Sequence, residues 1–237
     1  MTENQKLNIP QAIVLAGIII AVAIFFKLPT TGITSDKILP KDTTEKYTYA
    51  WEVKPTETSI NDHRLGSPTA QIVITEYSDT ECPFCKNFHK TMHQVIDNYK
   101  GEVAWVYKHL PLSGLHKYAY NEAVATECAE EQGGNIIFWR YLDAIFDSTT
   151  SNDGLPPAML PEIAESIELN KDLFSKCLLD PNISAQVDAD IEEVKTLTDK
   201  MGTPFAVIRK DGVIVDTING ALSYAKVIEK IDAVKNK

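Results

Sequence analysis

Two cysteines separated by two residues, Cys82 and Cys85, are the side chains of this 237-residue chain that are best suited to chemistry. They follow a β-branched stretch that ends at Tyr77 and precede a run with helical periodicity, so the pair falls at a strand-to-helix turn. The N-terminus of a helix stabilises negative charge, which favours the thiolate of the first cysteine. Two thiols at this spacing can also close into a disulfide ring. The pattern therefore predicts a redox-active dithiol.

Exchange between thiols and disulfides begins when a thiolate attacks a disulfide sulfur. Cys82, at the expected helix start, is the predicted nucleophile. Cys85, one helical turn further on, is placed to resolve the mixed disulfide. Pro83 and Phe84 lie between them and complete the redox motif. Proline suits the first turn of a helix, because its missing N–H leaves no hydrogen bond unmade there.

Zinc binding and a fixed structural disulfide are the alternatives for this stretch. Cys82, Cys85, His89 and His93 have the spacing C-x2-C-x3-H-x3-H and share one side of the expected helix. Zinc-finger ligand pairs are usually separated by a longer turn that lets two elements converge, whereas these four are strung along one helix. The spacing argues against a metal, so no metal ligand is assigned, and the two histidines are expected to be exposed.

The overall composition excludes one class of partner. The chain contains 33 acidic and 23 basic residues, a net charge of −10. This balance disfavours a surface that tracks nucleic-acid phosphates, so no nucleic-acid partner is expected. Its 44% hydrophobic and 24% charged residues are typical of a globular protein.

An apolar segment at residues 9–28 is close to the roughly 20 residues that a helix needs to cross a bilayer. No clear small-residue cleavage site follows it, so an uncleaved single-pass anchor is favoured over a cleaved signal peptide. Residues 1–8 are placed as a short cytoplasmic tail and the catalytic domain in the periplasm or exterior. The lysines that flank the segment, counted alone, favour the opposite orientation.

The other two cysteines, Cys128 and Cys177, lie on separate predicted helices. Disulfides persist outside the cytoplasm, so a structural bridge is favoured over the alternative of two buried thiols. Such a bridge would close a loop of about 50 residues and stabilise the fold by about 4 kcal/mol in the chain-entropy model.

The remaining patterns place the dithiol within an α/β fold. Residues 29–66 are rich in Thr, Ser, Pro and Lys and predict a linker, in which Tyr47, Tyr49 and Trp51 form either a short strand or scattered aromatics. The later elements are predicted as strands at 70–77, 103–107, 205–209 and 213–218, helices at 83–99 and 223–234, and helical segments at 118–131, 137–147, 157–169, 172–179 and 184–201. A βαβ part at 67–110 thus precedes a helical insertion at 111–201 and a ββα part at 202–237.

That order of elements is the thioredoxin fold with an inserted all-helical domain, here preceded by an N-terminal transmembrane helix. Three stretches of the sequence resemble the DsbA-like thiol–disulfide oxidoreductases, in particular their membrane-anchored or exported bacterial branch. They are EYSDTECPFC, HLPLSGLHKYAYNEAVATECAEEQGGNIIFWRYLDAIF and GTPFAVIRKDG. The resemblance covers about residues 66–235, and no cofactor is required for the activity it implies.

Two further parts of the site are implied by this resemblance. Thr203-Pro204 resembles the family's cis-proline position, which faces the active-site disulfide; the alternative is a trans proline that opens an edge strand. Glu76 resembles the buried acidic residue that the family keeps beneath the active site, where a carboxylate can relay protons. Strand alternation places Glu76 on the same face as Ile72 and Ile74.

Three other polar residues near the dithiol are expected to lie on the surface or to have a structural role. Asp79 and Glu81 are expected to be exposed loop acids, although their charge would oppose a low thiol pKa. His116 is expected to be a structural histidine at a helix entry.

The sequence therefore predicts a membrane-tethered thiol–disulfide oxidoreductase that oxidises cysteine pairs of exported proteins. If it is an oxidase, the resemblance implies a membrane partner that reoxidises the dithiol and passes electrons to a quinone. The alternatives are a reductase or isomerase on the same fold, a zinc-binding module, and a non-catalytic interaction domain. The family's strong oxidants often have a histidine between the cysteines, and its absence here leaves the direction of exchange open.

Overall fold

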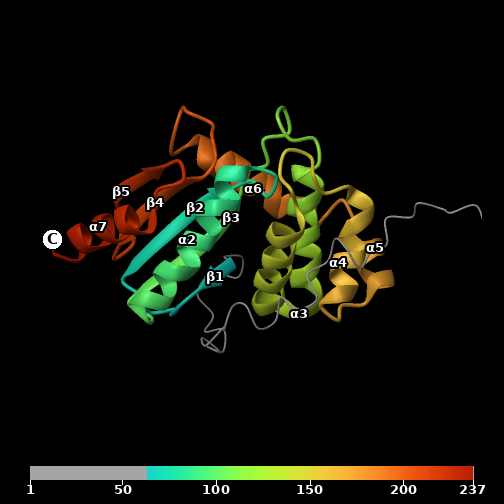
Figure 1. Cartoon of the computed structure of the whole chain (residues 1–237), viewed down its shortest axis with the longest axis horizontal. Coiled ribbons are helices and arrows are strands. Elements are labelled where there is room, and N and C mark those ends of the chain that lie inside the picture. The colour runs from blue at the N-terminus through green and yellow to red at the C-terminus, as the bar shows by residue number, and fades with distance from the viewer. Residues whose placement is uncertain (1–62, 237) are drawn as a thin grey trace, which may run out of the picture. The chain divides into compact units, whose positions relative to one another are not determined.

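The structure, a computed structural model, describes residues 63–236. Five strands form one mixed sheet in the order β1-β3-β2-β4-β5, with helices on both sides of it (Figure 1). The elements in chain order are β1 (His63–Leu65), β2 (Ile72–Ser78), α2 (Pro83–Tyr99), β3 (Val103–His109), α3 (Ala119–Ser148), η2 (Pro157–Met159), α4 (Leu160–Ser166), α5 (Lys171–Cys177), α6 (Ser184–Lys195), β4 (Phe205–Lys210), β5 (Val213–Asn219) and α7 (Tyr224–Lys235).

The central strands have the pairing expected of a thioredoxin fold. β2 and β3 are parallel, with Ile72 opposite Val103 at one end and Ser78 opposite His109 at the other. β4 pairs antiparallel with β2, and β5 pairs antiparallel with β4. The order β2-α2-β3 followed by β4-β5-α7 confirms the predicted βαβ and ββα halves.

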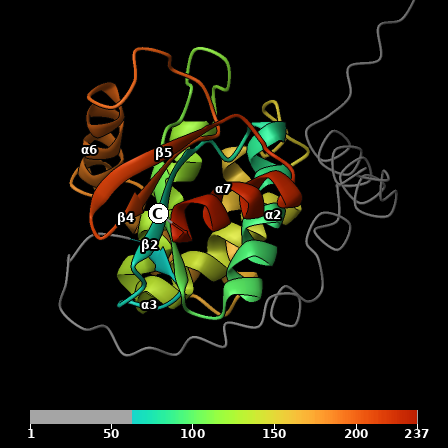
Figure 2. The same cartoon turned by 90° about the vertical axis from the view of Figure 1, so that its left-hand side faces the viewer.

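One face of the sheet holds the main core. α2 and α7 lie side by side over this face (Figures 1 and 2). The apolar stripe of α2 predicted from its periodicity is buried here, together with side chains from α3, the strands and α7. Ile72 and Ile74 of β2 point into this core. α2 is therefore packed against the core along its length, from Cys85 to Tyr99.

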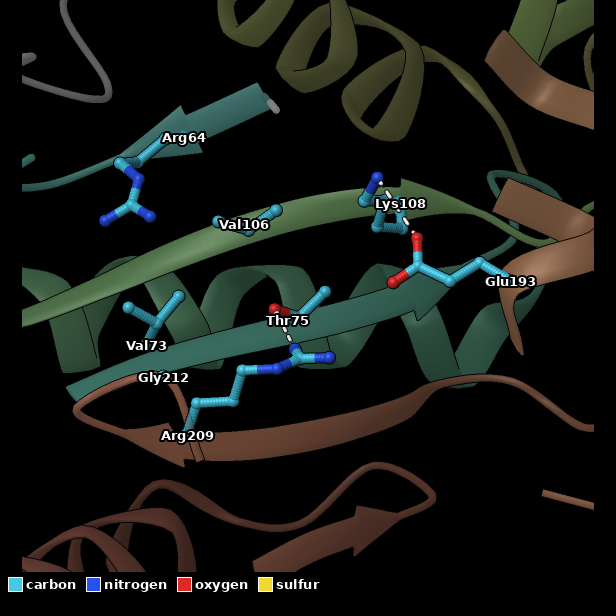
Figure 3. Close-up of a pocket in the computed structure, with 8 residues that line it drawn as sticks. All are labelled: Arg64, Val73, Thr75, Val106, Lys108, Glu193, Arg209 and Gly212. Atoms are coloured by element: carbon cyan, nitrogen blue, oxygen red, sulfur yellow. Dashed lines mark hydrogen bonds and ion pairs between the residues drawn. The ribbon is translucent and has the colours of Figure 1, made fainter. Parts of the chain in front are cut away.

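The opposite face is covered only in part. α6 packs against it near the ends of β2 and β4, where Tyr77, Phe205 and Val194 form a small cluster. Beyond α6 the sheet has a shallow hollow of about 290 Å³, lined by Arg64, Val73, Thr75, Val106, Lys108, Glu193, Arg209 and Gly212 (Figure 3). Arg209 donates to Thr75 at 2.8 Å, Lys108 lies 3.3 Å from Glu193, and Arg64 donates to the backbone oxygen of Ser67 at 3.5 Å.

The helical insertion packs around its own apolar cluster beside the sheet (Figure 1). The predicted gap between the helical segments 118–131 and 137–147 is found as a kink within α3, where Gly134 has φ 71° and ψ −169°. This left-handed φ favours glycine over residues with a Cβ. α6 ends at Lys195, earlier than the predicted 201. The Thr196 hydroxyl donates to the backbone oxygen of Glu193 at 2.7 Å, the local bonding by which β-branched hydroxyl residues compete with a helix.

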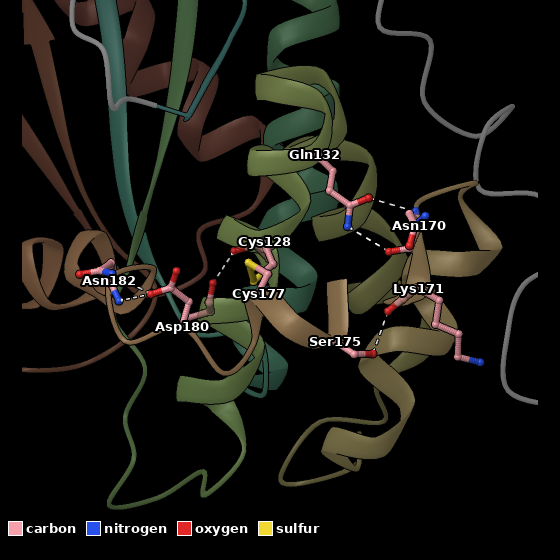
Figure 4. The surroundings of a disulfide bond; sticks show 10 residues. Cys128, Gln132, Asn170, Lys171, Ser175, Cys177, Asp180 and Asn182 are labelled. Atoms are coloured by element: carbon pink, nitrogen blue, oxygen red, sulfur yellow. Dashed lines mark hydrogen bonds between the residues drawn. A yellow bond between two sulfur atoms is a disulfide. The ribbon is translucent and has the colours of Figure 1, made fainter. Parts of the chain in front are cut away.

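Cys128 of α3 and Cys177 of α5 are joined by a disulfide, with Cα atoms 5.8 Å apart (Figure 4). The same two helices are also linked by Gln132, which exchanges two hydrogen bonds with the backbone of Asn170. Asn170 in turn caps α5 by accepting from the N–H of Leu173 at 2.9 Å. α5 is therefore tied to α3 at both of its ends.

β1 lies inside the range that was expected to be linker. Its three residues pair antiparallel with β3, and His63 and Leu65 are buried. These residues precede the predicted domain boundary at residue 67, and a strand this short has too few residues to show an alternating pattern. The predicted anchor at 9–28, the rest of the linker and Trp51 lie outside the described residues. Within 63–236, no helix is both long and apolar enough to cross a membrane.

Candidate active site

The dithiol lies where the turn after β2 enters α2. Cys82 is the N-cap residue of α2, with extended backbone angles of φ −78° and ψ 121°, and Pro83 occupies the first helical position. Both thiols are free, and Cys82 is 5% exposed whereas Cys85 is completely buried. Phe84, between them, is 62% exposed. An incoming disulfide can therefore reach only the first sulfur, beside an exposed aromatic ring.

The surroundings of Cys82 favour its thiolate. A hydrogen bond from the Cys85 thiol is the largest influence, and with donors from Thr203 and from the backbone of Cys85 and Phe84 it outweighs burial and lowers the pKa of Cys82 to about 5. Burial, followed by the hydrogen bond and charge of Cys82, raises the pKa of Cys85 well above its usual range. The two thiols thus have opposite tendencies, one ionised and one protonated at neutral pH.

Thr203 and Pro204 meet the dithiol from the other half of the fold. The Thr203-Pro204 peptide bond is cis and leads directly into β4. The Cys82 Sγ lies 3.6 Å from the backbone oxygen of Thr203. The Thr203 hydroxyl is buried and bonds to no described residue other than Cys82, so its proton can be directed at the thiolate. The structure therefore brings together these predicted site residues, 121 positions apart in sequence.

Glu76 lies beneath the dithiol on β2. Its side chain is fully buried, on the face of the strand that also presents Ile72 and Ile74 to the core. Burial, with a smaller contribution from the charge of Cys82, raises the pKa of Glu76 to about 8. Glu76 is consequently protonated at neutral pH, where it can supply or accept a proton as the charge on the cysteines changes.

The expectation that Asp79 and Glu81 are exposed is wrong, because both are buried. Asp79 accepts from the backbone N–H groups of Glu81 and Leu112, each at 2.8 Å, and lies 2.9 Å from Nδ1 of His116. Burial by itself would lower the pKa of His116, but the hydrogen bond and charge of Asp79 raise it. Asp79 and His116 thus form a buried pair next to the dithiol.

Glu81 ties the active-site loop to the helical insertion. Its carboxylate accepts from the Thr149 hydroxyl at 3.0 Å and from the backbone N–H groups of Gly154 and Leu155 at 3.0 and 3.1 Å. Glu122 of α3 is buried nearby, and burial followed by its hydrogen bond with Glu81 raises the pKa of Glu122 to about 10. Sequence reasoning missed this pair of acids, and no local pattern marks Glu122 because its neighbours come from distant loops.

The expectation that His89 and His93 are exposed is also wrong. Both are buried on α2 and face Asp143 of α3, with Nε2 atoms 2.6 and 3.0 Å from its Oδ1. Among the described residues, no group of convergent metal ligands combines these histidines with Cys82 and Cys85. The C-x2-C-x3-H-x3-H spacing therefore divides into a dithiol at the helix start and a histidine pair that meets the insertion.

The alkylation rate of Cys82 should follow the unusual acidity of this thiol. In the reduced protein we expect the rate with iodoacetamide to rise with pH around a midpoint near 5, four units below the ordinary value of 9.0. In Cys85→Ser the midpoint should move upward, because the strongest donor to the thiolate is changed. Mass spectrometry of the modified cysteine gives the rates. A wild-type midpoint near 9 would contradict this account of the site.

A family model and solved structures of other proteins match the part of the chain that contains the site. A family model described as thioredoxin matches residues 58–232, a range that contains every site residue named above. The crystal structure of DsbA2 from Pseudomonas aeruginosa matches with a TM-score of 0.63 at 29% identity, over 76% of this chain and 97% of that one. The oxidised structure of BdbD from Bacillus subtilis matches with a TM-score of 0.62 over 73% and 92% of the two chains. At 20% identity, the second likeness shows the fold alone.

Curated sequences also match, over a shorter range. A protein named Na(+)/H(+) antiporter NhaA 3, from Salinispora tropica, is 34% identical over 143 residues, which is 60% of this chain and 21% of that protein. NhaA 1 from Salinispora arenicola matches over the same shares at 31% identity. The chain thus spans about a fifth of the length of these relatives, and their transport activity is not carried over to it.

Proposed function

The chain belongs to the thioredoxin family, as a DsbA-like member, and from this premise we propose that it is an extracytoplasmic oxidase of protein thiols. Its substrates in this proposal are cysteine pairs of exported proteins. The single observation that favours this function is the contrast between an acidic thiol at Cys82 and a buried, protonated thiol at Cys85.

The proposed reaction starts from the Cys82–Cys85 disulfide. A substrate thiolate attacks Sγ of Cys82, breaks the bond to Cys85 and forms a mixed disulfide, while Cys85 leaves and takes up a proton. The second substrate thiolate then attacks the substrate sulfur of the mixed disulfide and releases Cys82 as a thiolate. The substrate loses two electrons and becomes a disulfide, and the enzyme becomes a dithiol. Glu76, protonated and buried below, is the proposed proton donor to Cys85.

The acidity of Cys82 favours oxidation over reduction. A thiolate with a low pKa is a good leaving group, and stabilising it stabilises the reduced enzyme. Because the pKa of Cys82 is lowered from 9.0 to about 5, this stabilisation grows as pH rises from about 5 towards 9 and is lost as pH falls through 5. The disulfide form has no such contribution, so at neutral pH the equilibrium is drawn towards the reduced enzyme and the oxidised substrate.

The location and the partners are part of the same proposal. The apolar segment at 9–28 is the proposed membrane anchor, with the catalytic domain outside the cytoplasm. The Cys128–Cys177 disulfide supports an oxidising compartment, where such bridges persist. Each turnover leaves the enzyme with two electrons, so a membrane reoxidase that passes them to a quinone is the proposed second partner.

The redox potential of the dithiol tests the direction of exchange. The full chain in detergent is equilibrated with defined ratios of reduced and oxidised glutathione, and the free thiols at positions 82 and 85 are counted after acid quenching. We expect the Cys82–Cys85 pair to have a redox potential of about −120 mV, which is that of a strong oxidant. A value near about −180 mV would favour an isomerase, and one near about −270 mV a reductase. Either would contradict the oxidase proposal.

A further inference from the structure

Three buried side chains from three separate elements converge on one point away from the dithiol. His63 begins β1, His109 ends β3 and Glu127 lies on α3. The Nε2 of His63 lies 2.6 Å from Oε1 of Glu127, and the Nε2 of His109 lies 2.8 Å from the same oxygen. The two histidines are 1% exposed and the glutamate 7% exposed.

The donor set is that of a transition-metal site. Two imidazole nitrogens and one carboxylate oxygen are ligands that zinc accepts at about 2.0–2.2 Å. In a tetrahedral site such ligands stand about 3.3 Å from one another, and these three atoms all lie within 4.8 Å of each other. The two separations between Nε2 and Oε1, now 2.6 and 2.8 Å, would have to widen by about 0.5–0.7 Å to admit the ion. We propose that His63, His109 and Glu127 bind a divalent metal ion, with zinc as the best match.

Neighbouring groups orient the ligands as in known metal sites. Nδ1 of His63 lies 3.4 Å from Oε2 of Glu130, and metal-binding histidines commonly direct their second nitrogen at a carboxylate. The ring of Phe138 stacks on the ring of His63, with centroids 3.5 Å apart and an angle of 3° between the planes. Asp190 accepts the backbone N–H of His109 at 2.9 Å. The ring of His63 is thus held with Nε2 towards Glu127, and the backbone of His109 is fixed at the end of β3.

One of the three proposed ligands borders a cavity. Glu127 and Glu130 form part of the wall of a cavity of about 600 Å³, together with Glu131, Asn182 and Gln186 among others. An entry path is one requirement of a real metal site. The acidic lining attracts cations, and the open side can supply a water as the fourth ligand. A bound ion would join the first strand of the domain to β3 and to the helical insertion.

A simple hydrogen-bonded cluster is the competing explanation, with both histidines donating to Glu127. A second convergent group, His89, His93 and Asp143, also offers metal ligands. Any test must therefore separate three possibilities: an ion on Glu127, an ion on Asp143 and no ion at all. It must also prevent binding to the thiolates of the active site.

Zinc titration of the oxidised, metal-stripped full chain distinguishes these three possibilities. With the Cys82–Cys85 disulfide closed, calorimetry should give one zinc per chain and a dissociation constant below about 1 µM. Glu127→Gln, which keeps the shape of the side chain, should weaken binding at least 100-fold, and Glu130→Gln about 10- to 100-fold. Glu131→Gln in the same cavity and His93→Asn in the other cluster should bind as the wild type does.

Cobalt provides a second signal that does not depend on calorimetry. Co²⁺ in the wild type should show visible d–d bands of tetrahedral intensity, and these should be lost in Glu127→Gln. Melting curves show whether each variant is folded. If Glu127→Gln does not fold, Glu130→Gln tests the site in its place. Absence of zinc binding at 100 µM, or binding that survives Glu127→Gln and is lost in His93→Asn, would overturn the proposal. Neither outcome bears on the exchange activity, which is assayed separately.

Discussion

Replacing Cys82 with serine is expected to abolish thiol–disulfide exchange. The alcohol of serine is not ionised at neutral pH, whereas the pKa of Cys82 is lowered to about 5, so the substitution removes the nucleophile and the leaving group together. We expect the rate of disulfide formation in a reduced two-cysteine peptide to fall at least about 1,000-fold, as when other enzymes lose their nucleophile. Peptide oxidation followed by mass spectrometry measures the rate.

Cys85→Ser is the matched control, because it changes the other sulfur of the same pair. The remaining Cys82 thiol is the partly accessible one, so this variant should still form a mixed disulfide with an oxidised peptide and should fail to resolve it. Cys82→Ser should form no such adduct, since its remaining thiol is buried and has a raised pKa. If the Cys82→Ser variant formed the adduct and the Cys85→Ser variant did not, the roles of the two cysteines would be reversed.

Local chemistry was sufficient to predict the elements that position the dithiol. Pro83 at the first position and an apolar stripe up to Tyr99 predicted α2 with the bounds that the structure has. Strand alternation correctly placed Glu76 with the two isoleucines facing the core. Gly134 marked the kink in α3 because its left-handed φ is one that glycine readily adopts. These features depend on neighbours within a few residues.

The polar surroundings of the site could not be predicted in the same way. Charged side chains are mostly exposed and histidine is intermediate in burial, and the expectation of exposure for Asp79, Glu81, His89 and His93 followed that tendency. Each is buried against a partner far along the chain: Asp79 contacts His116 at a separation of 37 residues, Glu81 contacts Leu155 at 74, and His89 contacts Asp143 at 54. One sequence contains no sign of such long-range pairs.

The Cys128–Cys177 disulfide should account for much of the stability of the helical insertion. It closes a sequence separation of 49 residues, and in the chain-entropy model the loss of such a bridge costs about 4 kcal/mol. We expect the double variant Cys128→Ala, Cys177→Ala to unfold with a free energy lower by about that amount. Urea unfolding followed by circular dichroism measures the difference. The Cys82–Cys85 disulfide is kept closed in both proteins, because opening it would add the stabilisation of the Cys82 thiolate to the comparison.

The loss of stability in the double variant should appear first where α5 meets α3. Apart from the disulfide, α5 is held to α3 by the buried ring of Phe174, which packs against Tyr141, and by the exposed hydrogen bonds between Gln132 and Asn170. The core beneath the dithiol is a separate cluster that includes neither cysteine of the bridge. Hydrogen exchange should therefore accelerate in α4 and α5 of the double variant before it does in α2. Equal acceleration in α2, or a stability loss below about 1 kcal/mol, would show that the bridge is not what holds the insertion together.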